Sequence, residues 1–473
     1  MRNQEGDRTS EIAGQRVFPL RFLGMGVYLT WLLTIHYSTG VFGTADMATQ
    51  SLIVSNSANV IGLLLIVLFA RRLAPLCSRV PVLLLAGIGG TAGTLLAAVS
   101  PQAMMLSAAL FFVGNVLIGT ATALLILLWN EFFAAFPRRE VAVFGSGSYV
   151  LSTALYYFVG MLDGGIRVAF IALLPIASVF MLSRSIRIAS DQNEVIRETT
   201  DSKWSFPWRP SLLLAVFAFA MTVSRSLSFQ SNDAGMLGML IVSVVVLLFN
   251  VFAFERFDVR MLYKAAPPLM VSGALLIAFF DGFDAIGNML LNAGFSGFII
   301  LSLIVLSGIS YNYGVTAIWL FGLTRVFRVL ATVGAAFGYT WLSEAGLADP
   351  KVIGACVIVL VVTASMFLLT DRDFASSWGI NPIRSGSLTE ADAFYQSVEG
   401  KCSVIGHRCG LTPREEEVLV LLAQDKTIAE IEQALFISNG TAKSHIRHIY
   451  AKLGLHSRKE VVDLVAGMQG DSD

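Results

Sequence analysis

Basic side chains gather on one face of a short segment near the end of the chain. The segment 433–459 contains five Lys or Arg residues and no Asp or Glu. Within it, Lys443, Ser444 and Arg447 fall on one side of an expected helix over 439–453, opposite its apolar positions. Cationic side chains at that spacing are typical of contacts with the phosphates and base edges of duplex DNA.

Helix-start signals divide the end of the chain into four short helices. Thr412, Thr427 and Ser457 are each followed three residues later by Glu, which is the pattern of a capping box, and Ser438 is a further N-cap. The expected helices are 413–423, 428–435, 439–453 and 458–467. The short turn between the second and third of them predicts a helix-turn-helix.

In this region the chain resembles the DNA-binding domain of LuxR-type regulators, over the run LTPREEEVLVLLAQDKTIAEIEQALFISNGTAKSHIRHIYAKLGLHSRKEVVDL. The resemblance implies that the third helix reads the major groove and that the fourth mediates dimerisation on a two-fold symmetric site. It assigns groove contacts to Lys443, Ser444 and Arg447. It assigns phosphate contacts to Thr441 and Lys452.

Three positions depart from the pattern of that family. Asp425 stands where Gly is usual after the first helix, and Ile428 stands where Asn is common. Glu432 stands where a small Ala lets the two helices of the motif pack closely. We therefore expect Glu432 either to point along the rim of the helix pair or to force the two helices apart.

Polar residues also occur inside long apolar stretches, where they tend to face a bundle interior or a cavity. Tyr149, Tyr156 and Asn292 have this setting. The candidates for a ligand cavity are His36, Asn56, Asn59, Asn115, Arg225, Asn288, Tyr311 and Asn312. The alternative is that these side chains form hydrogen bonds between helices. Arg225 has the further alternative of extending to the outer lipid headgroups.

The chain as a whole is too apolar for a soluble globule. Of its 473 residues, 55% are apolar and 14% charged, against about 45–50% and about 25% in soluble domains. Charged residues make up 40 of residues 1–370 but 26 of the 103 residues in 371–473. This pattern excludes a single soluble domain, a secreted disulfide scaffold and a disordered chain. It predicts an all-α membrane helix bundle followed by a small four-helix domain.

A helix needs about 20 apolar residues to cross a bilayer. Twelve stretches meet this need: 20–40, 51–70, 81–99, 103–129, 142–161, 166–183, 211–228, 234–254, 266–283, 294–320, 326–343 and 351–370. With the N-terminus inside, the inner segments hold 19 Lys and Arg, including Arg325 and Arg328, and the outer loops hold 3. This bias predicts a multi-pass protein of the inner membrane with both termini in the cytoplasm.

The expected layout is six spans, a polar cytoplasmic loop at 184–210 and six more spans. This layout resembles that of major facilitator superfamily transporters, whose halves are structural repeats. The expected halves are about 20–183 and 211–370. A repeat is also indicated by Trp129 and Trp319, each expected at the end of the fourth span of its half. The loop ARRLAPLCSRV lacks the Gly and Asp typical of those transporters, which puts transport in doubt.

The remaining segments flank these two parts. Residues 1–19 are expected to be a cytoplasmic N-terminal segment, and 371–410 a linker with a short helix at about 388–398. Residues 411–473 form the expected LuxR-type domain. The polar start of the chain leads into an apolar stretch too long for a cleavable signal peptide.

The motifs of the chain do not indicate catalysis. We find no Walker loop, no nucleophile elbow and no metal-ligand pair at helical spacing. Cys402, His407 and Cys409 offer three soft ligands for zinc, but their spacing fits no strong pattern and a fourth ligand is not evident. The sequence therefore predicts no enzyme, no metal site and no cofactor.

We interpret the chain as a membrane-bound transcription regulator. Its tail would bind promoter DNA as a homodimer through the last helix, and the membrane domain, held in lipid, would sense an unknown small-molecule ligand. One alternative is a secondary transporter with a regulatory DNA-binding tail, which an acidic residue buried in the middle of an early span would favour; Glu131 and Asp163 fall at span ends. Another is a simple membrane anchor, for which one span would suffice.

Overall fold

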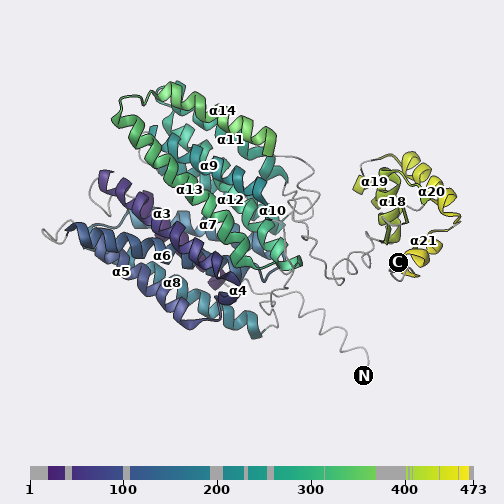
Figure 1. The fold of residues 1–473 in the computed structure, drawn as a ribbon, viewed down its shortest axis with the longest axis horizontal. Coiled ribbons are helices and arrows are strands. Elements are labelled where there is room, and N and C mark those ends of the chain that lie inside the picture. The colour runs from purple at the N-terminus through teal and green to yellow at the C-terminus, as the bar shows by residue number, and fades with distance from the viewer. Residues whose placement is uncertain are drawn as a thin grey trace. The chain divides into compact units, whose positions relative to one another are not determined.

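The computed structural model describes residues 20–37, 45–99, 107–191, 206–227, 233–252, 260–313, 315–368, 401–402, 405–406, 409–424, 426–435, 437–455 and 457–467. All regular elements in these residues are helices, as expected of an all-α chain (Figure 1). The chain divides into two compact units, Met1–Ile383 and Arg384–Asp473. The first unit is the membrane domain, and we call the second the tail.

The first half of the membrane domain contains six long helices and two short ones. They are η1 (Leu20–Leu23), α2 (Gly24–Tyr37), α3 (Ala45–Leu68), α4 (Ala70–Leu73), α5 (Val80–Val99), α6 (Ser107–Phe133), α7 (Arg138–Gly160) and α8 (Gly164–Asp191). The second half contains six more. They are α9 (Trp208–Leu227), α10 (Asp233–Phe252), α11 (Arg260–Phe279), α12 (Asp284–Tyr313), α13 (Ala317–Glu344) and α14 (Pro350–Leu368).

Eleven helices of the described residues are long and apolar enough to cross a membrane. They are α3 and α5 to α14, and each corresponds to one of the expected spans. The first expected span, 20–40, is occupied by the 4-residue η1 and the 14-residue α2, which are shorter. The prediction of a polytopic membrane bundle is confirmed.

The boundary between the tenth and eleventh spans was wrongly predicted. The tenth was expected at 294–320 and the eleventh at 326–343, but α12 ends at Tyr313 and α13 begins at Ala317. Trp319 therefore lies near the start of α13, so its match to Trp129 does not support a repeat. The apolar run continues across the break between these helices, and hydropathy alone could not locate it.

A repeat is nevertheless present, because the two halves pack in the same way. In each half the third helix packs against the fourth and the sixth, as in α5 with α6 and α8, and α11 with α12 and α14. The first helix of each half packs against the fifth, and the second against the fourth. Between the halves, α3 packs against α13 and α7 against α10, so the second helix of each half meets the fifth of the other.

Two glycines allow equivalent helix pairs of the two halves to approach closely. A Cβ atom on Gly119 of α6 would lie 2.1 Å from the carbonyl oxygen of Ser55 on α3. A Cβ atom on Gly238 of α10 would lie 1.9 Å from the carbonyl oxygen of Met289 on α12. Membrane helices commonly use such small residues where their backbones meet.

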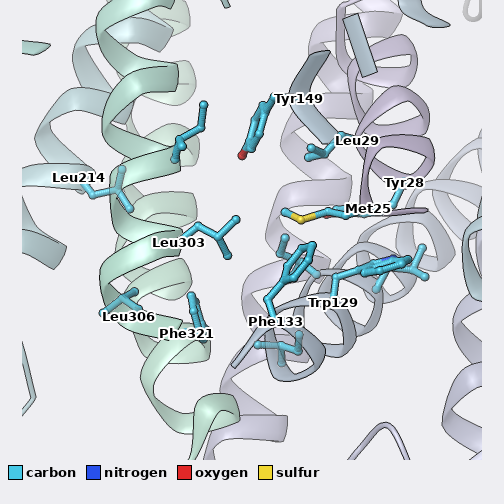
Figure 2. Packing of buried hydrophobic residues seen from close by; sticks show 14 of the residues in the cluster. Met25, Tyr28, Leu29, Trp129, Phe133, Tyr149, Leu214, Leu303, Leu306 and Phe321 are labelled. Atoms are coloured by element: carbon cyan, nitrogen blue, oxygen red, sulfur yellow. The ribbon is translucent and has the colours of Figure 1, made fainter. Parts of the chain in front are cut away.

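Apolar side chains of both halves meet in the middle of the membrane domain. Figure 2 shows Leu214, Leu303, Leu306 and Phe321 of the second half opposite Met25, Leu29, Trp129 and Phe133 of the first half. Trp129 is fixed by its indole N–H, which donates to Oγ of Ser178 on α8 at 2.9 Å. These side chains belong to one apolar core shared by the two halves.

The tail contains the four helices that the capping signals predict. They are α18 (Pro413–Ala423), α19 (Ile428–Leu435), α20 (Asn439–Leu453) and α21 (Arg458–Gly467), all labelled in Figure 1. Each contributes apolar side chains to one core, which includes Val418, Ile431, Ile449 and Val461. The tail therefore has a hydrophobic core separate from that of the membrane domain. The short helix expected at about 388–398 lies outside the described residues.

Candidate functional sites

Helix α20 presents two different faces because of its sequence pattern. Ser438 begins it as N-cap, with its hydroxyl accepting the N–H of Thr441 at 3.3 Å. Gly454 ends it in a left-handed conformation at φ 67°, which Gly adopts without strain. Ala442, Ile446 and Ile449 of its apolar stripe are buried against the other tail helices.

The opposite face of α20 carries the predicted groove contacts. Lys443 and Arg447 are both exposed. Because they are four residues apart, they lie one helical turn from each other on the same face. Ser444 beside them is half-buried. Thr441, predicted to hold a phosphate, is exposed, and its hydroxyl lies 2.9 Å from that of Ser438.

Lys452, the other predicted phosphate contact, has partners within the tail. Its Nζ lies 2.7 Å from Oε2 of Glu415 on α18 and 3.0 Å from the carbonyl oxygen of Gly410. His448 adds an Nδ1 atom 3.8 Å from Oε1 of the same carboxylate. The sequence identified Glu415 as part of a capping box, but no local pattern links it to a lysine 37 residues later.

Two carboxylates of the tail have lowered pKa values. The hydrogen bond from Lys452 and that from the N–H of Thr412 lower the pKa of Glu415 to about 2. The backbone N–H and hydroxyl of Thr427, together with Lys426, lower the pKa of Glu430 to about 2. Both carboxylates complete capping boxes, which the sequence predicted from the Thr-x-x-Glu spacing.

Glu432 adopts the first of its two expected arrangements. Its Oε1 atom accepts a hydrogen bond from Nδ2 of Asn439, the first residue of α20. The carboxylate thus lies along the rim, beside the start of the basic helix. Ile428, the second departure from the family pattern, is half-buried against the core. Asp425 lies outside the described residues.

A cavity lies between the two halves of the membrane domain. Its volume is about 120 Å³, and we call it the first cavity. Four of the predicted ligand-site residues line it: His36, Asn56, Asn59 and Arg225. Asn115, Asn288 and Tyr311 are not among its lining residues, and the side chain of Asn312 lies outside the described residues.

Asn115 takes part in helix packing, the alternative interpretation of such residues. Its Oδ1 accepts a hydrogen bond from Oγ of Ser51, which joins α6 to α3. His36 shares this role, since its Nε2 lies 3.1 Å from Oγ of Ser55 and so joins α2 to α3. His36 therefore both lines the first cavity and fixes a neighbouring helix.

Arg325 and Arg328 were wrongly assigned to an inner loop. Both lie inside α13 and line the first cavity together with Tyr149 and Asn292. A charge inside a span is costly in lipid, and this made a loop the simpler prediction. The cavity removes that cost, since it gives polar side chains a place away from lipid. The remaining inner loops are still richer in Lys and Arg than the outer ones.

Glu131 does not line the first cavity. Its side chain is buried at the end of α6, where its carboxylate accepts the N–H groups of Leu76 at 3.0 Å and Cys77 at 2.7 Å. It therefore fixes the turn before α5. In the tail, Cys402 is buried in the core and Cys409 is exposed, while His407 lies outside the described residues.

Solved structures resemble the membrane domain at the level of fold. The human organic anion transporter MFSD10 aligns over 75% of this chain and 99% of its own, with TM-score 0.53 and 16% identity. A bacterial homologue of the iron transporter ferroportin aligns over 74% of this chain and 96% of its own, with TM-score 0.55 and 15% identity. The predicted likeness to major facilitator transporters is confirmed for the fold.

Sequence relatives match part of the chain. The spore germination protein GerE of Bacillus subtilis is 50% identical over 52 residues, which are 11% of this chain and 70% of that protein. A Mycobacterium tuberculosis protein described as an HTH-type transcriptional regulator is 36% identical over 106 residues, or 22% of this chain. The chain covers only 12% of that mycobacterial relative's length.

A family model adds the boundaries of the match. The model of bacterial regulatory proteins of the luxR family matches residues 410–465, which include all four tail helices up to Val465. The predicted LuxR-type DNA-binding domain is confirmed by this match and by GerE. The chain, a multi-pass membrane protein, belongs to the luxR family of bacterial regulatory proteins.

Proposed function

We propose that the protein is a transcription regulator of the inner membrane that binds promoter DNA through α20 and senses a small molecule through its membrane domain. Both termini lie in the cytoplasm in this proposal. The bias of Lys and Arg toward the inner loops supports that orientation.

One observation carries the DNA-binding part of the proposal. Lys443 and Arg447 stand exposed, one turn apart, on the face of α20 opposite the buried Ala442 and Ile449. A helix fixed on one side by a core and basic on the other fits the major groove, with its charges near phosphates and bases. Lys443, Ser444 and Arg447 then contact the groove, and Thr441 contacts the backbone. Lys452 contacts a phosphate only if it exchanges its bond with Glu415 for one to DNA.

Helix α21 supports a homodimer on DNA. Val461 and Val465 are buried in the tail core, whereas Leu464 on the same helix is 38% exposed. An exposed Leu next to a buried pair offers apolar surface to a second copy of the helix. Two tails joined there would read two half-sites related by a two-fold axis.

The membrane domain would act on the tail through a shift between conformations. A ligand that binds one arrangement of the two halves more tightly raises the population of that arrangement. In the chain α14 is the last helix of the membrane domain before the tail, and we expect the two arrangements to differ in how easily two tails pair on DNA. This coupling makes DNA binding depend on the ligand.

The decisive experiment is to sequence the DNA bound by the full-length protein in cells. We expect discrete promoter sites with two-fold symmetry, lost in a double Lys443→Ala, Arg447→Ala variant. Lys426→Ala, which removes an exposed charge two residues before α19, is the matched control and should retain the sites. A C-terminus located outside the cytoplasm, or sites unchanged in the double variant, would contradict the proposal.

A second candidate function is secondary transport with a regulatory DNA-binding tail. The first cavity, lined by residues of both halves, favours it because transporters with repeated halves bind substrates at that interface. Uptake into proteoliposomes, measured with and without a proton gradient, distinguishes the two functions. Uptake that depends on the gradient would establish transport. DNA binding without uptake would support the sensor function instead.

A further inference from the structure

Three arginines of the second half line the first cavity. Arg225 belongs to α9, and Arg325 and Arg328 belong to α13. No Asp or Glu occurs among the described residues that line it. We propose that the first cavity binds a small organic acid as its anion, held by these guanidinium groups. The inference rests on the proposed function and names the class of molecule that the membrane domain senses.

Contacts of two of the arginines indicate what the first cavity can hold. Nη2 of Arg225 donates to the carbonyl oxygen of His36 at 2.8 Å, and this bond helps to orient the guanidinium. Nε of Arg325 is buried and has no hydrogen-bond partner in the part of the chain that the structure describes. A carboxylate would supply both acceptors and charge, and it matches the planar donor geometry of Arg.

We expect the anion to be held at the arginines of α13 and not to pass beyond them. Arg325 and Arg328 line the first cavity and also a second cavity of about 40 Å³, together with Tyr149 and Ile299. The second cavity is lined by several of the apolar side chains that Figure 2 shows packed between the halves, among them Met25, Leu214, Leu303, Leu306 and Phe321. A charged molecule would have to lose its solvation to pass this packing. We therefore expect the anion to bind at the guanidinium groups of Arg325 and Arg328, in the first cavity.

The size and lining of the first cavity narrow the ligand further. A volume of about 120 Å³ is close to that of the apolar cavity of about 150 Å³ that holds benzene. Leu29, Met221 and Phe295 offer apolar contacts to a ring or short carbon chain. Oδ1 of Asn59 is buried and has no donor among the described residues, so a hydroxyl on the ligand would complete its hydrogen bonding. A hydroxylated aromatic acid satisfies all three features.

The position of the site explains how binding would alter the halves. Asn59 and Tyr149 belong to α3 and α7 of the first half, whereas Arg325 and Arg328 belong to α13 of the second. Helix α3 packs directly against α13. An anion bound between them favours the arrangement in which both sets of side chains reach it.

The test measures binding to the purified full-length protein in nanodiscs of neutral lipid, by titration calorimetry and thermal unfolding, without DNA. The probes are 4-hydroxybenzoate, benzoate, succinate and the neutral 4-hydroxybenzamide. We expect saturable binding of 4-hydroxybenzoate, weaker binding of benzoate, and at least tenfold weaker binding of 4-hydroxybenzamide. Arg325→Gln should weaken 4-hydroxybenzoate at least tenfold, while Arg187→Gln on the exposed end of α8 should not. If Arg325→Gln does not fold, Arg325→Lys retains the charge and should bind with intermediate affinity.

Several results would overturn the inference. These are equal binding of the acid and its amide, affinity unchanged in Arg325→Gln, or no binding of any of the three acids. If the acid binds in neutral nanodiscs but no longer binds when anionic lipid is added, the lipid headgroup competes for the first cavity. The occupant would then be a lipid headgroup and not a free acid. Because no DNA is present, a regulator that fails to bind promoters can still pass this test. A protein that binds promoters without binding any acid would refute only this inference.

Discussion

Nζ of Lys452 lies 2.7 Å from Oε2 of Glu415, so the last turn of α20 is tied to the first turn of α18. The same Glu415 carboxylate accepts the N–H of Thr412 at 2.8 Å and completes the capping box there. One buried side chain therefore stabilises the start of one helix and holds the end of another. This contact joins α20 to α18 in addition to their apolar packing.

The tail should lose stability in acid because of this carboxylate. The folded-state pKa of Glu415 is about 2, below its ordinary value of 4.5. Its stabilising effect is therefore complete above about pH 4.5 and is lost as the pH falls toward 2. We expect the free energy of unfolding of segment 384–473 to fall over this window in urea titrations. In Glu415→Gln the fall should be smaller, though still present because the pKa of Glu430 is also lowered. Equal falls in the two proteins would contradict this assignment.

Single alanine substitutions should separate the roles of the two exposed basic residues. Removing a residue that contacts a base should weaken binding to the preferred sequence by about 1–3 kcal/mol. Removing one that contacts a phosphate should lower the slope of log affinity against log salt concentration by about 1. We expect Lys443→Ala and Arg447→Ala each to show one of these effects in fluorescence anisotropy at several salt concentrations. Lys426→Ala is the control, and a loss as large in that variant would indicate a nonspecific charge effect.

Local patterns predicted the tail well because its signals are short in range. The Thr-x-x-Glu spacings and Ser438 each act within about one helical turn, and the helices begin as these residues indicate. The contact of Lys452 with Glu415 was not predictable in the same way. It joins residues 37 apart, and its formation depends on how α18 and α20 pack.

In the membrane domain, eleven of the twelve expected spans correspond to helices long enough to cross a membrane, but the residues of the first cavity were harder to predict. Hydropathy identifies apolar stretches, and two polar residues within them, Asn59 and Arg225, line the first cavity. It failed at Arg325 because a charge in an apolar stretch is treated as a loop residue. Only the packing of the second half against the first reveals that this position faces a cavity, and that Asn115 instead bonds to Ser51.

Removing the charge of Glu432 should tighten DNA binding. The carboxylate accepts a hydrogen bond from Asn439 at the start of α20, where the helix would approach the phosphate backbone. Glu432→Gln retains an acceptor for Asn439 but removes the repulsion, so we expect affinity to rise about two- to fivefold at low salt and less at high salt. Weaker binding by Glu432→Gln at every salt concentration would mean that the charge itself positions Asn439.

A charged residue at 464 should prevent two tails from pairing. Leu464 is 38% exposed on α21, while Val461 and Val465 hold the helix to its own core. We expect Leu464→Asp to reduce affinity for a two-fold symmetric site at least tenfold but to leave binding to a single half-site unchanged, because burial of a carboxylate at an interface is costly. Sedimentation and gel-shift titrations of segment 384–473 measure both. Dimers that persist in this variant would exclude α21 as the contact.

A methyl group at Gly119 should disrupt the membrane domain, whereas one at Gly89 should not. The added Cβ at Gly119 would lie 2.1 Å from the carbonyl oxygen of Ser55, so α6 and α3 must move apart. Such overpacking costs about 1–3 kcal/mol or more. Gly89, also in a long helix, has no atom within 4 Å of an added Cβ and serves as the matched control. Size-exclusion profiles and melting temperatures in detergent should show a destabilised Gly119→Ala protein and an unchanged Gly89→Ala protein. Equal stability of the two would mean that α3 and α6 are not in the close contact described here.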